Sequence, residues 1–488
     1  MTGEKIRFHP SVVLENLMRF AIFAVIFLLV SVEERPIEAF LAIGGLLGVA
    51  AIILFLRWRR TTVQFNENEL IVERNTIFKM KRSIPYSKIA SINVNRTIIS
   101  RMFGTSRLQV NVNSSSNATV PEAVLVFKKD LADRIRNHLS RNMYDSEPVI
   151  EAEQGSVVNV DNTDVLVHGL FSQSTMQTIS GFIFLAWSIF EMYSDAGGST
   201  GGSSALSLGM FFFVTVVPSV MLIVHYANFK VYRVKDTIYL QHGLISTYRT
   251  SFNVSRINAI HVKSTMASRL MGRSYIEADV IGLGSSKDSQ RPVLCLLKRN
   301  DVIEAVLKDL VPEFVYDRNI IVQPKGAKKA IAAKASLGSA FVAVMAAALT
   351  WVVGTTDRTG LSGIERTVVE NMFIAAGAAI VLAIILWGYR SYRVKELSLG
   401  EDLFTFVNGV VDRRRTTMCY DKVQIVNVSK GPLARRFGLA VGSISLLSSK
   451  GSVSVSSGYF TEADLNKVHE TVMQRLVNGK YDHRANEI

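Results

Sequence analysis

The sequence has little cysteine and none of the spacings that hold a metal ion or a nucleotide. Its 488 residues include only two cysteines, Cys295 and Cys419, and both stand in apolar, strand-like surroundings. A disulfide framework is therefore not supported, and reduced core cysteines in a reducing compartment are expected. None of the eight histidines stands in a zinc-binding spacing, and the glycine-rich segments lack the lysine of a P-loop. We expect no metal and no cofactor.

Groups that catalysis, ion transport or nucleic-acid binding would require are also missing. The sequence nominates no base and orienting acid beside a serine, so we expect no enzyme. The apolar runs have no charged residue near their midpoints, which argues against an ion pump or channel. The basic segments show no interleaved aromatic residues and no known nucleic-acid motif, so no nucleic-acid partner is expected.

Long apolar runs, in contrast, are abundant. Hydrophobic residues make up 48% of the chain while 20% are charged, a profile typical of a membrane protein with domains in water. Six runs approach the ~20 residues that cross a bilayer. They form three pairs: 17–32 with 38–56, 176–193 with 206–227, and 336–354 with 369–388. Buried helix pairs of a soluble protein are the disfavoured alternative, because every run is paired and flanked by charge.

The charge around these runs predicts their orientation. The loops inside each pair are acidic or roughly neutral, whereas the outer ends are basic, as at 57–60, Lys230 and Arg390. Because cytoplasmic flanks of membrane helices are enriched in lysine and arginine, both termini and all soluble segments are expected in the cytoplasm. The net charge of +14 belongs to the soluble segments, since lysine and arginine outnumber the acids in 57–145, 229–311 and 390–480.

One spacing occurs three times and divides the chain. A basic residue is followed sixteen positions later by a glycine that is expected to form a turn. The three cases are Lys88 to Gly104, Arg256 to Gly272, and Lys422 to Gly438. The local words match as well, as in Arg-Met-Phe-Gly, Arg-Leu-Met-Gly and Arg-Arg-Phe-Gly. A unit of about 160 to 170 residues is therefore expected in three copies.

Each unit is predicted to consist mainly of strands. Several stretches between residues 61 and 127 alternate apolar and polar residues, which is typical of strands. Residues 129–139 instead have apolar residues four apart, which predicts a helix, and the other units close in the same way at 300–307 and 461–468. About six or seven short strands followed by one helix predict a small antiparallel barrel or sandwich. The pattern does not determine which strands pair.

These patterns give domain boundaries. We predict an N-terminal segment with hairpin 1 at 1–60, soluble module 1 at 61–145, a linker with hairpin 2 at 146–228, soluble module 2 at 229–315, a linker with hairpin 3 at 316–390, soluble module 3 at 391–480, and a C-terminal tail at 481–488.

The order of hairpin, strands and closing helix resembles bacterial pleckstrin-homology-like (PH-like) membrane proteins of the YdbT type. The resemblance covers essentially the whole chain. Besides the spans and the repeated spacing, it rests on the first strands of the second and third units, Tyr232-Arg233-Val234 and Tyr392-Arg393-Val394. The first unit departs there, with Arg60-Thr61-Thr62-Val63.

The resemblance implies a fold and a location. The expected fold class is a multi-domain α+β membrane protein: three repeats of a transmembrane helical hairpin followed by a PH-like antiparallel β-barrel or sandwich with a C-terminal helix. The expected location is the bacterial inner membrane. Eukaryotic relatives of such modules often bind phosphoinositide head groups or peptides, but fold alone does not transfer that function. Bacterial members are not generally known as enzymes, and some relatives are associated with resistance to membrane-active antibacterial peptides.

Basic residues near the repeated spacing are the candidates for binding anionic lipid or a partner. They are Lys79, Lys81, Arg82, Lys88 and Arg101 in the first unit, Arg249, Arg256, Arg269 and Arg273 in the second, and Arg413, Arg414, Arg415, Lys422, Arg435 and Arg436 in the third. Anionic lipid attracts such groups by roughly 1 kcal/mol per residue near the membrane surface. The alternative is that they only set the orientation and solubility of the modules.

The leading hypothesis is a non-enzymatic platform at the inner leaflet. Three tethered basic modules would bind anionic lipid or partner proteins together, because tethering raises effective concentration. The expected partners are membrane lipids and another membrane protein, such as a smaller PH-like protein, with a homo-oligomer as a further option. The alternative function is transport or antimicrobial-peptide resistance, in which the hairpins are the working part.

Overall fold

The computed structural model describes residues 5–18, 20, 36–76, 78–112, 121–144, 158, 160–194, 201–283, 291–355, 363–449 and 451–479. The predicted first apolar span, apart from Leu17, Met18 and Phe20, lies outside these residues. The predicted C-terminal tail at 481–488 also lies outside them.

Three segments of the chain contain the same succession of elements. The first consists of β2 (Thr61–Phe65), β3 (Glu69–Asn75), β4 (Lys79–Pro85), a 3-10 turn (Tyr86–Lys88), β5 (Ile89–Arg96), α3 (Ile98–Met102), β6 (Thr105–Val112), β7 (Ala123–Lys128) and α4 (Lys129–Tyr144). The second consists of β8 (Lys230–Val234), β9 (Thr237–His242), β10 (Thr247–Asn253), a turn (Val254–Arg256), β11 (Ile257–Ser264), α9 (Met266–Leu270), β12 (Arg273–Val280), β13 (Val293–Arg299) and α10 (Asn300–Leu310). The third consists of β15 (Glu396–Leu399), β16 (Leu403–Asn408), β17 (Arg413–Cys419), a turn (Tyr420–Lys422), β18 (Val423–Ser429), α13 (Pro432–Arg436), β19 (Leu439–Ser448), β20 (Gly451–Thr461) and α14 (Glu462–Val477).

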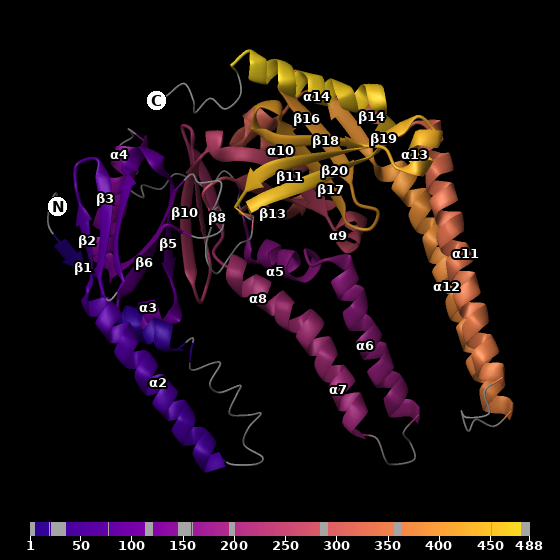
Figure 1. Ribbon diagram of the computed structural model, residues 1–488, viewed down its shortest axis with the longest axis horizontal. Helices are drawn as coiled ribbons and strands as arrows, with labels where there is room; N and C mark the ends of the chain where they lie inside the picture. The colour runs from indigo at the N-terminus through magenta and orange to yellow at the C-terminus, as the bar shows by residue number, and fades with distance from the viewer. Residues whose placement is uncertain are drawn as a thin grey trace.

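Among the described residues, four helical stretches are long and apolar enough to cross a membrane. The candidate spans are Leu41–Arg59 in α2 (Pro36–Arg59), Ser204–Tyr226 in α7 (Gly201–Phe211) and α8 (Val217–Tyr226), Lys325–Thr355 in α11 and Arg366–Val394 in α12 (Gly363–Val394). Almost none of their residues is buried inside the protein. Figure 1 shows these helices extending from one side of the β-rich body, toward the bottom of the view. The fold is thus α+β, with apolar helices suited to a bilayer and antiparallel sheets outside it.

The second predicted hairpin is less regular than a pair of equal spans. Its first run forms helix α6 (Thr175–Ser194), which is less apolar than the four candidate spans because it includes Gln177 and Glu191. Its second run is interrupted by a π-helical turn, Phe212–Val216, just before Pro218. A π turn beside a proline is a usual cause of a helix kink.

The sheets are shared between segments, which the strand pattern could not reveal. The orders are β1-β2-β3-β4, β7-β6-β5-β10-β9-β8, β13-β12-β11-β17-β16-β15-β14 and β18-β19-β20. Antiparallel pairing of β5 with β10 joins the first segment to the second, and pairing of β11 with β17 joins the second to the third. The body is therefore a row of linked layers, not a set of separate barrels.

Each segment still has its own apolar core under its closing helix. In the first segment, Phe65 and Leu108 from opposite layers pack with Ile135 and Leu139 of α4, and each is at most 1% exposed. This confirms the helical face predicted at 129–139. The third core also contains Ala259 of β11, so the strand exchange carries a residue of one segment into the core of the next.

Four local features differ from the sequence-based expectation. Helix α5 (Asn162–Phe171) occupies part of the predicted linker and packs on β13. Strand β14 (Ile320–Val322), also in a predicted linker, pairs with β15. Tyr392-Arg393-Val394 is not a strand but the last turn of α12, where Tyr392 packs against the α11–α13 contact and Arg393 lies over the Tyr389 ring. Strand β15 then begins at Glu396, six residues after Arg390, the position that the alignment of Tyr392 with Tyr232 pairs with the first residue of β8, Lys230.

The three glycines of the repeated spacing have the same backbone conformation. Gly104, Gly272 and Gly438 have φ values of 62°, 63° and 65°, and each follows a five-residue helix. Side chains rarely adopt a positive φ, whereas glycine does so without steric cost. All three glycines thus have a conformation suited to a tight turn, and the constant spacing corresponds to one strand plus one short helix.

Candidate functional site

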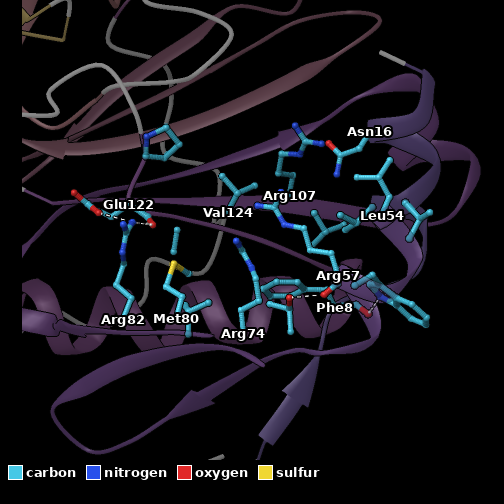
Figure 2. Close-up of a pocket in the computed structure, with 18 of the residues that line it drawn as sticks. Phe8, Asn16, Leu54, Arg57, Arg74, Met80, Arg82, Arg107, Glu122 and Val124 are labelled. Carbon is cyan, nitrogen blue, oxygen red and sulfur yellow. Dashed lines mark hydrogen bonds and ion pairs between the residues drawn. The ribbon is translucent and has the colours of Figure 1, made fainter. Parts of the chain in front are cut away.

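A pocket of about 700 Å³ opens where α2 meets the first segment (Figure 2). One wall is formed by residues of the N-terminal segment and the end of α2, and the other by β3, β4, β6 and β7. Its apolar lining includes Phe8, Val12, Val13, Phe20, Leu54, Met80 and Val124, and its basic lining is Arg57, Arg74, Arg82 and Arg107. The pocket therefore combines an apolar surface, continuous with a candidate span, and a cluster of arginines.

Backbone pairing fixes the N-terminal segment against this pocket. Strand β1 (Lys5–Arg7) pairs with β2, and the His9 N–H donates to the Val126 carbonyl at 2.8 Å. The indole N–H of Trp58, in the last turn of α2, donates to the Phe8 carbonyl at 2.8 Å. These bonds tie the end of a candidate span to the β layer, so the pocket lies at the boundary between the apolar helix and the sheet.

The pocket is electrostatically unbalanced toward positive charge. Arg107 forms an almost fully buried ion pair with Glu15, and Arg82 contacts Glu122 at 2.7 Å. Within the described part of the chain, the Nε atoms of Arg74 and Arg107 are buried without a hydrogen-bond partner. Burial, reinforced by the charges of Arg57 and Arg82, lowers the pKa of the Arg74 guanidinium. An anionic group would relieve this repulsion and supply the missing acceptors.

A second basic cleft, of about 370 Å³, lies where the second and third segments meet. Its arginines are Arg269, Arg273, Arg318, Arg413 and Arg415, and its carboxylates are Glu304 and Glu396. Arg413 pairs with Glu396 at 2.9 Å and Arg415 with Glu304 at 2.8 Å. The pairing of β11 with β17 thus assembles four of the predicted basic candidates from two segments that are far apart in sequence.

The short helices that precede the glycine turns lie against the apolar helices. Thr265, which caps α9, donates to the Phe171 carbonyl at 2.7 Å just before α6 begins. Ala434 of α13 packs against Ala327 and Ala330 of α11. Figure 1 shows α3, α9 and α13 on the side of the body from which the apolar helices extend. The predicted cations Arg101, Arg269, Arg435 and Arg436 belong to these three helices.

Two of these helices also expose apolar side chains. In α3, Ile98 is 56% and Met102 78% exposed, and in α9 Leu270 is 82% exposed. Apolar side chains interleaved with arginine, beside candidate spans, are typical of a surface that touches the membrane interface.

The other predicted candidates are not brought into one site. Lys79, Lys81, Arg249 and Arg414 lie along strands β4, β10 and β17, whereas Lys88, Arg256 and Lys422 lie in the three 3-10 turns. Lys81 lies 3.9 Å from the Glu73 carboxylate. Among the four arginines that line the pocket beside α2, Arg82 is the one that the sequence analysis named.

Sequence reasoning missed Arg57, Arg74, Arg107 and Arg318. Arg57 was interpreted as a basic flank of a span, and Arg107 stands at the start of an alternating strand whose partner Glu15 is 92 residues away. Periodicity gives no sign of such long-range pairs. Arg74 offered one signal, because it places a charge on the face of β3 whose preceding residues, Leu70 and Val72, are apolar and buried.

A buried polar network also joins the second and third segments. His261 Nε2 lies 2.6 Å from Asp279, and His261 Nδ1 lies 2.9 Å from the Thr416 hydroxyl. Arg291 and Ser448 donate to the other carboxylate oxygen at 2.5 and 2.6 Å. Hydroxyl, imidazole and carboxylate stand in the order of a catalytic triad, but all three are at most 1% exposed, so substrate cannot reach them. Among the described residues, no group of three or more His, Cys, Asp or Glu is placed to hold a metal ion.

Comparisons with known proteins agree with this architecture. The family described as "Bacterial PH domain" matches residues 20–143 and 337–476, which together are more than half of the chain. The chain is also 20% identical over 386 residues to the UPF0699 transmembrane protein YdbT of Bacillus subtilis (strain 168), a match that covers 70% of this chain and 77% of that relative. No solved structure matches. With its apolar helices and antiparallel sheets, this chain belongs to the bacterial PH domain family of membrane proteins.

Proposed function

We propose that the protein is a non-enzymatic membrane platform that binds anionic lipid in the pocket of the first segment. The observation that carries the proposal is the pairing of an apolar wall, which includes Leu54 of a candidate span, with buried arginine Nε atoms that have no acceptor among the described residues. A phospholipid offers the matching features, since its acyl chain would lie along α2 while its phosphate accepts from Arg57, Arg74 and Arg107.

The finer architecture belongs to the same proposal. The three segments, each preceded by apolar helices, would be three copies of one hairpin-plus-module unit, of which the family matches the first and the third. The exposed apolar residues of α3 and α9 would rest on the lipid interface, so that several weak contacts act together. The second cleft would add a site for an anionic group of lipid or of a partner protein.

Removing two pocket arginines should weaken lipid binding. In nanodiscs that contain photoactivatable phosphatidylglycerol, we expect covalent labelling of residues around the pocket. At about 1 kcal/mol per basic residue, the double change Arg57→Gln with Arg74→Gln should reduce that labelling by about tenfold or more. The measurement is the fraction of labelled pocket peptides by mass spectrometry.

The matched control removes the same charge elsewhere. Lys129→Gln with Arg134→Gln, on exposed positions of α4, should leave the labelling unchanged. Photoactivatable phosphatidylcholine should label the pocket weakly, because its head group has no net charge. Equal labelling by the two lipids, or labelling that survives the Arg57→Gln and Arg74→Gln change, would contradict the proposal.

We also propose that the sheets lie on the cytoplasmic side of the bacterial inner membrane. Helices α2 and α12 both have an arginine in the last turn before the sheets, Arg59 and Arg393, as the positive-inside rule expects of cytoplasmic ends. In intact cells, a membrane-impermeant maleimide should not label exposed Lys129→Cys or Glu470→Cys variants. It should label both after permeabilisation, and labelling before permeabilisation would reverse the orientation.

A further inference from the structure

Strands β4 and β18 lie at opposite ends of the row of sheets. Inside the row, the strands equivalent to them pair with one another across the junctions between segments. The first strand after the 3-10 turn pairs with the last strand before the next turn at both internal junctions, β5 with β10 and β11 with β17. The remaining strand of the first kind is β18, and the remaining strand of the second kind is β4. Among the described residues, each of these two strands ends its sheet.

The internal junctions share one register. Ser251 of β10 pairs with Ile92 of β5, and Thr417 of β17 pairs with Ile260 of β11. Counted from the 3-10 turns, Ser251 and Thr417 occupy the same position, as do Ile92 and Ile260. The same geometry is therefore used twice, and it would place Ser83 of β4 opposite Val426 of β18.

Exposure confirms that β18 differs from its equivalents. Ser91 in β5 and Ala259 in β11 are both 0% exposed, since Ser91 donates to the Gly282 carbonyl of the second segment and Ala259 packs in the core of the third. Ile425, at the same position of β18, is 59% exposed. An apolar side chain on an open strand edge is a usual site of strand addition.

The charges on β4 do not prevent such pairing. Lysine on an edge strand commonly blocks association, and β4 contains Lys79, Lys81 and Arg82. Strand β17, however, has three consecutive arginines and still pairs with β11 through all of them, from Arg413 opposite Ser264 to Arg415 opposite Val262. Basic residues at this edge are thus compatible with the junction.

By contrast, the strands β7, β13 and β20 end their sheets in all three segments. The fold leaves that edge open each time, so it gives no reason to expect a partner there. The β4 and β18 edges differ, because their equivalents pair with a strand of the neighbouring segment at both internal junctions.

We propose that β18 of one copy of this chain pairs antiparallel with β4 of a second copy, so that copies assemble head to tail along the membrane. The contact has the same register as the two internal junctions and joins the same two types of strand. The apolar helices α2, α7, α8, α11 and α12 extend from the same side of the body in Figure 1, so a copy added by the internal rule would keep these helices in the same bilayer. Because the two surfaces differ, the assembly is heterologous and grows from either end.

Cross-linking between differently tagged copies tests the pairing. In the shared register, Lys81 stands opposite Val428, at a cross-strand Cβ separation of about 5 Å. We expect Lys81→Cys in one full-length copy and Val428→Cys in a second, co-expressed in bacterial membranes, to give a dimer with both tags after treatment with a short bis-maleimide. The control pair Lys79→Cys and Val426→Cys is four positions out of register, about 13 Å along the strand, and should give none. Wild-type copies report the background from Cys295 and Cys419.

Matched substitutions at Ile425 separate loss of pairing from loss of folding. Ile425→Lys would place a charge against the buried side of β4 and should abolish the Lys81–Val428 dimer. Ile425→Ala should retain it, since alanine occupies this position in β11. Because Ile425 is largely exposed, both variants should reach the membrane at wild-type level. Cross-links between two Val428→Cys copies alone, dimers equally abundant in the out-of-register control, or no dimer at all would overturn the proposal.

Discussion

Replacing Asp279 by asparagine is expected to lower the free energy of unfolding by about 3 kcal/mol, because it breaks one partner of a buried ion pair. The carboxylate is 0% exposed and accepts from Arg291 at 2.5 Å. Burial alone would raise the pKa of Asp279, but the hydrogen bond and charge of His261, together with Arg291, outweigh burial and lower it. The carboxyl is therefore ionised in the folded protein, and asparagine leaves the Arg291 charge uncompensated. Chemical unfolding in detergent, followed by protease resistance, measures the loss.

Two further variants identify the origin of this effect. Adding Arg291→Gln to Asp279→Asn should recover part of the loss, since the double variant no longer buries a lone charge. Asp301→Asn removes a carboxylate of an exposed pair with Arg299 and should change nothing measurable. If Asp279→Asn is as stable as the wild type, the network does not hold the second and third segments together.

Much of the local structure followed from periodicity, because helices and turns depend on near neighbours. The helix at 129–139 is found as α4, and Thr461 caps α14 by accepting from the Asp464 N–H. The three positive-φ glycines were foreseen from their spacing alone. The error at Tyr392-Arg393-Val394 has a local cause as well, since a helix that leaves the membrane continues for as long as its next turn finds packing.

The joining of sheets between segments could not be predicted in this way. Strand pairing is decided by which strand edges meet in three dimensions. The sequence pattern of an edge strand is the same as that of an inner strand when their faces are equally apolar. Ile92 and Val426 have the same pattern around them, yet one lies inside a six-stranded sheet and the other at an edge. Only the difference in burial between the two strands in the folded protein distinguishes them.

The sequence predicted which type of residue lines the candidate site, but not where in the fold the site lies. Counting basic residues led to Arg82, Arg269, Arg273, Arg413 and Arg415, which do line the two pockets. Position along the sequence did not show which basic residues line a pocket, so the cations of the 3-10 turns ranked equally with these five. Arg74 and Arg107 owe their role to desolvation, which arises from the N-terminal segment that folds over them.

Acidification is expected to destabilise the protein through two buried histidines. Burial lowers the pKa of His168 to about 3, and burial together with the charge of His225 lowers the pKa of His242 to about 3. In the unfolded chain each would titrate near 6.5. Because the folded pKa is the lower one, the stabilising contribution is complete above pH 6.5 and is lost as the pH falls toward 3. Between pH 7.5 and 5 the loss should be about 2 kcal/mol for each histidine.

His168→Phe tests this assignment, since it keeps the ring contacts with Tyr226 and Tyr275 but cannot bind a proton. The free energy of unfolding of this variant should fall less steeply between pH 7.5 and 5, by about 2 kcal/mol over the interval. Tyr275→Phe alters the same ring cluster while retaining the histidine, so its slope should match the wild type. An unchanged slope in His168→Phe would mean that the imidazole is protonated without unfolding, and hence that water reaches the space between α5 and the second segment.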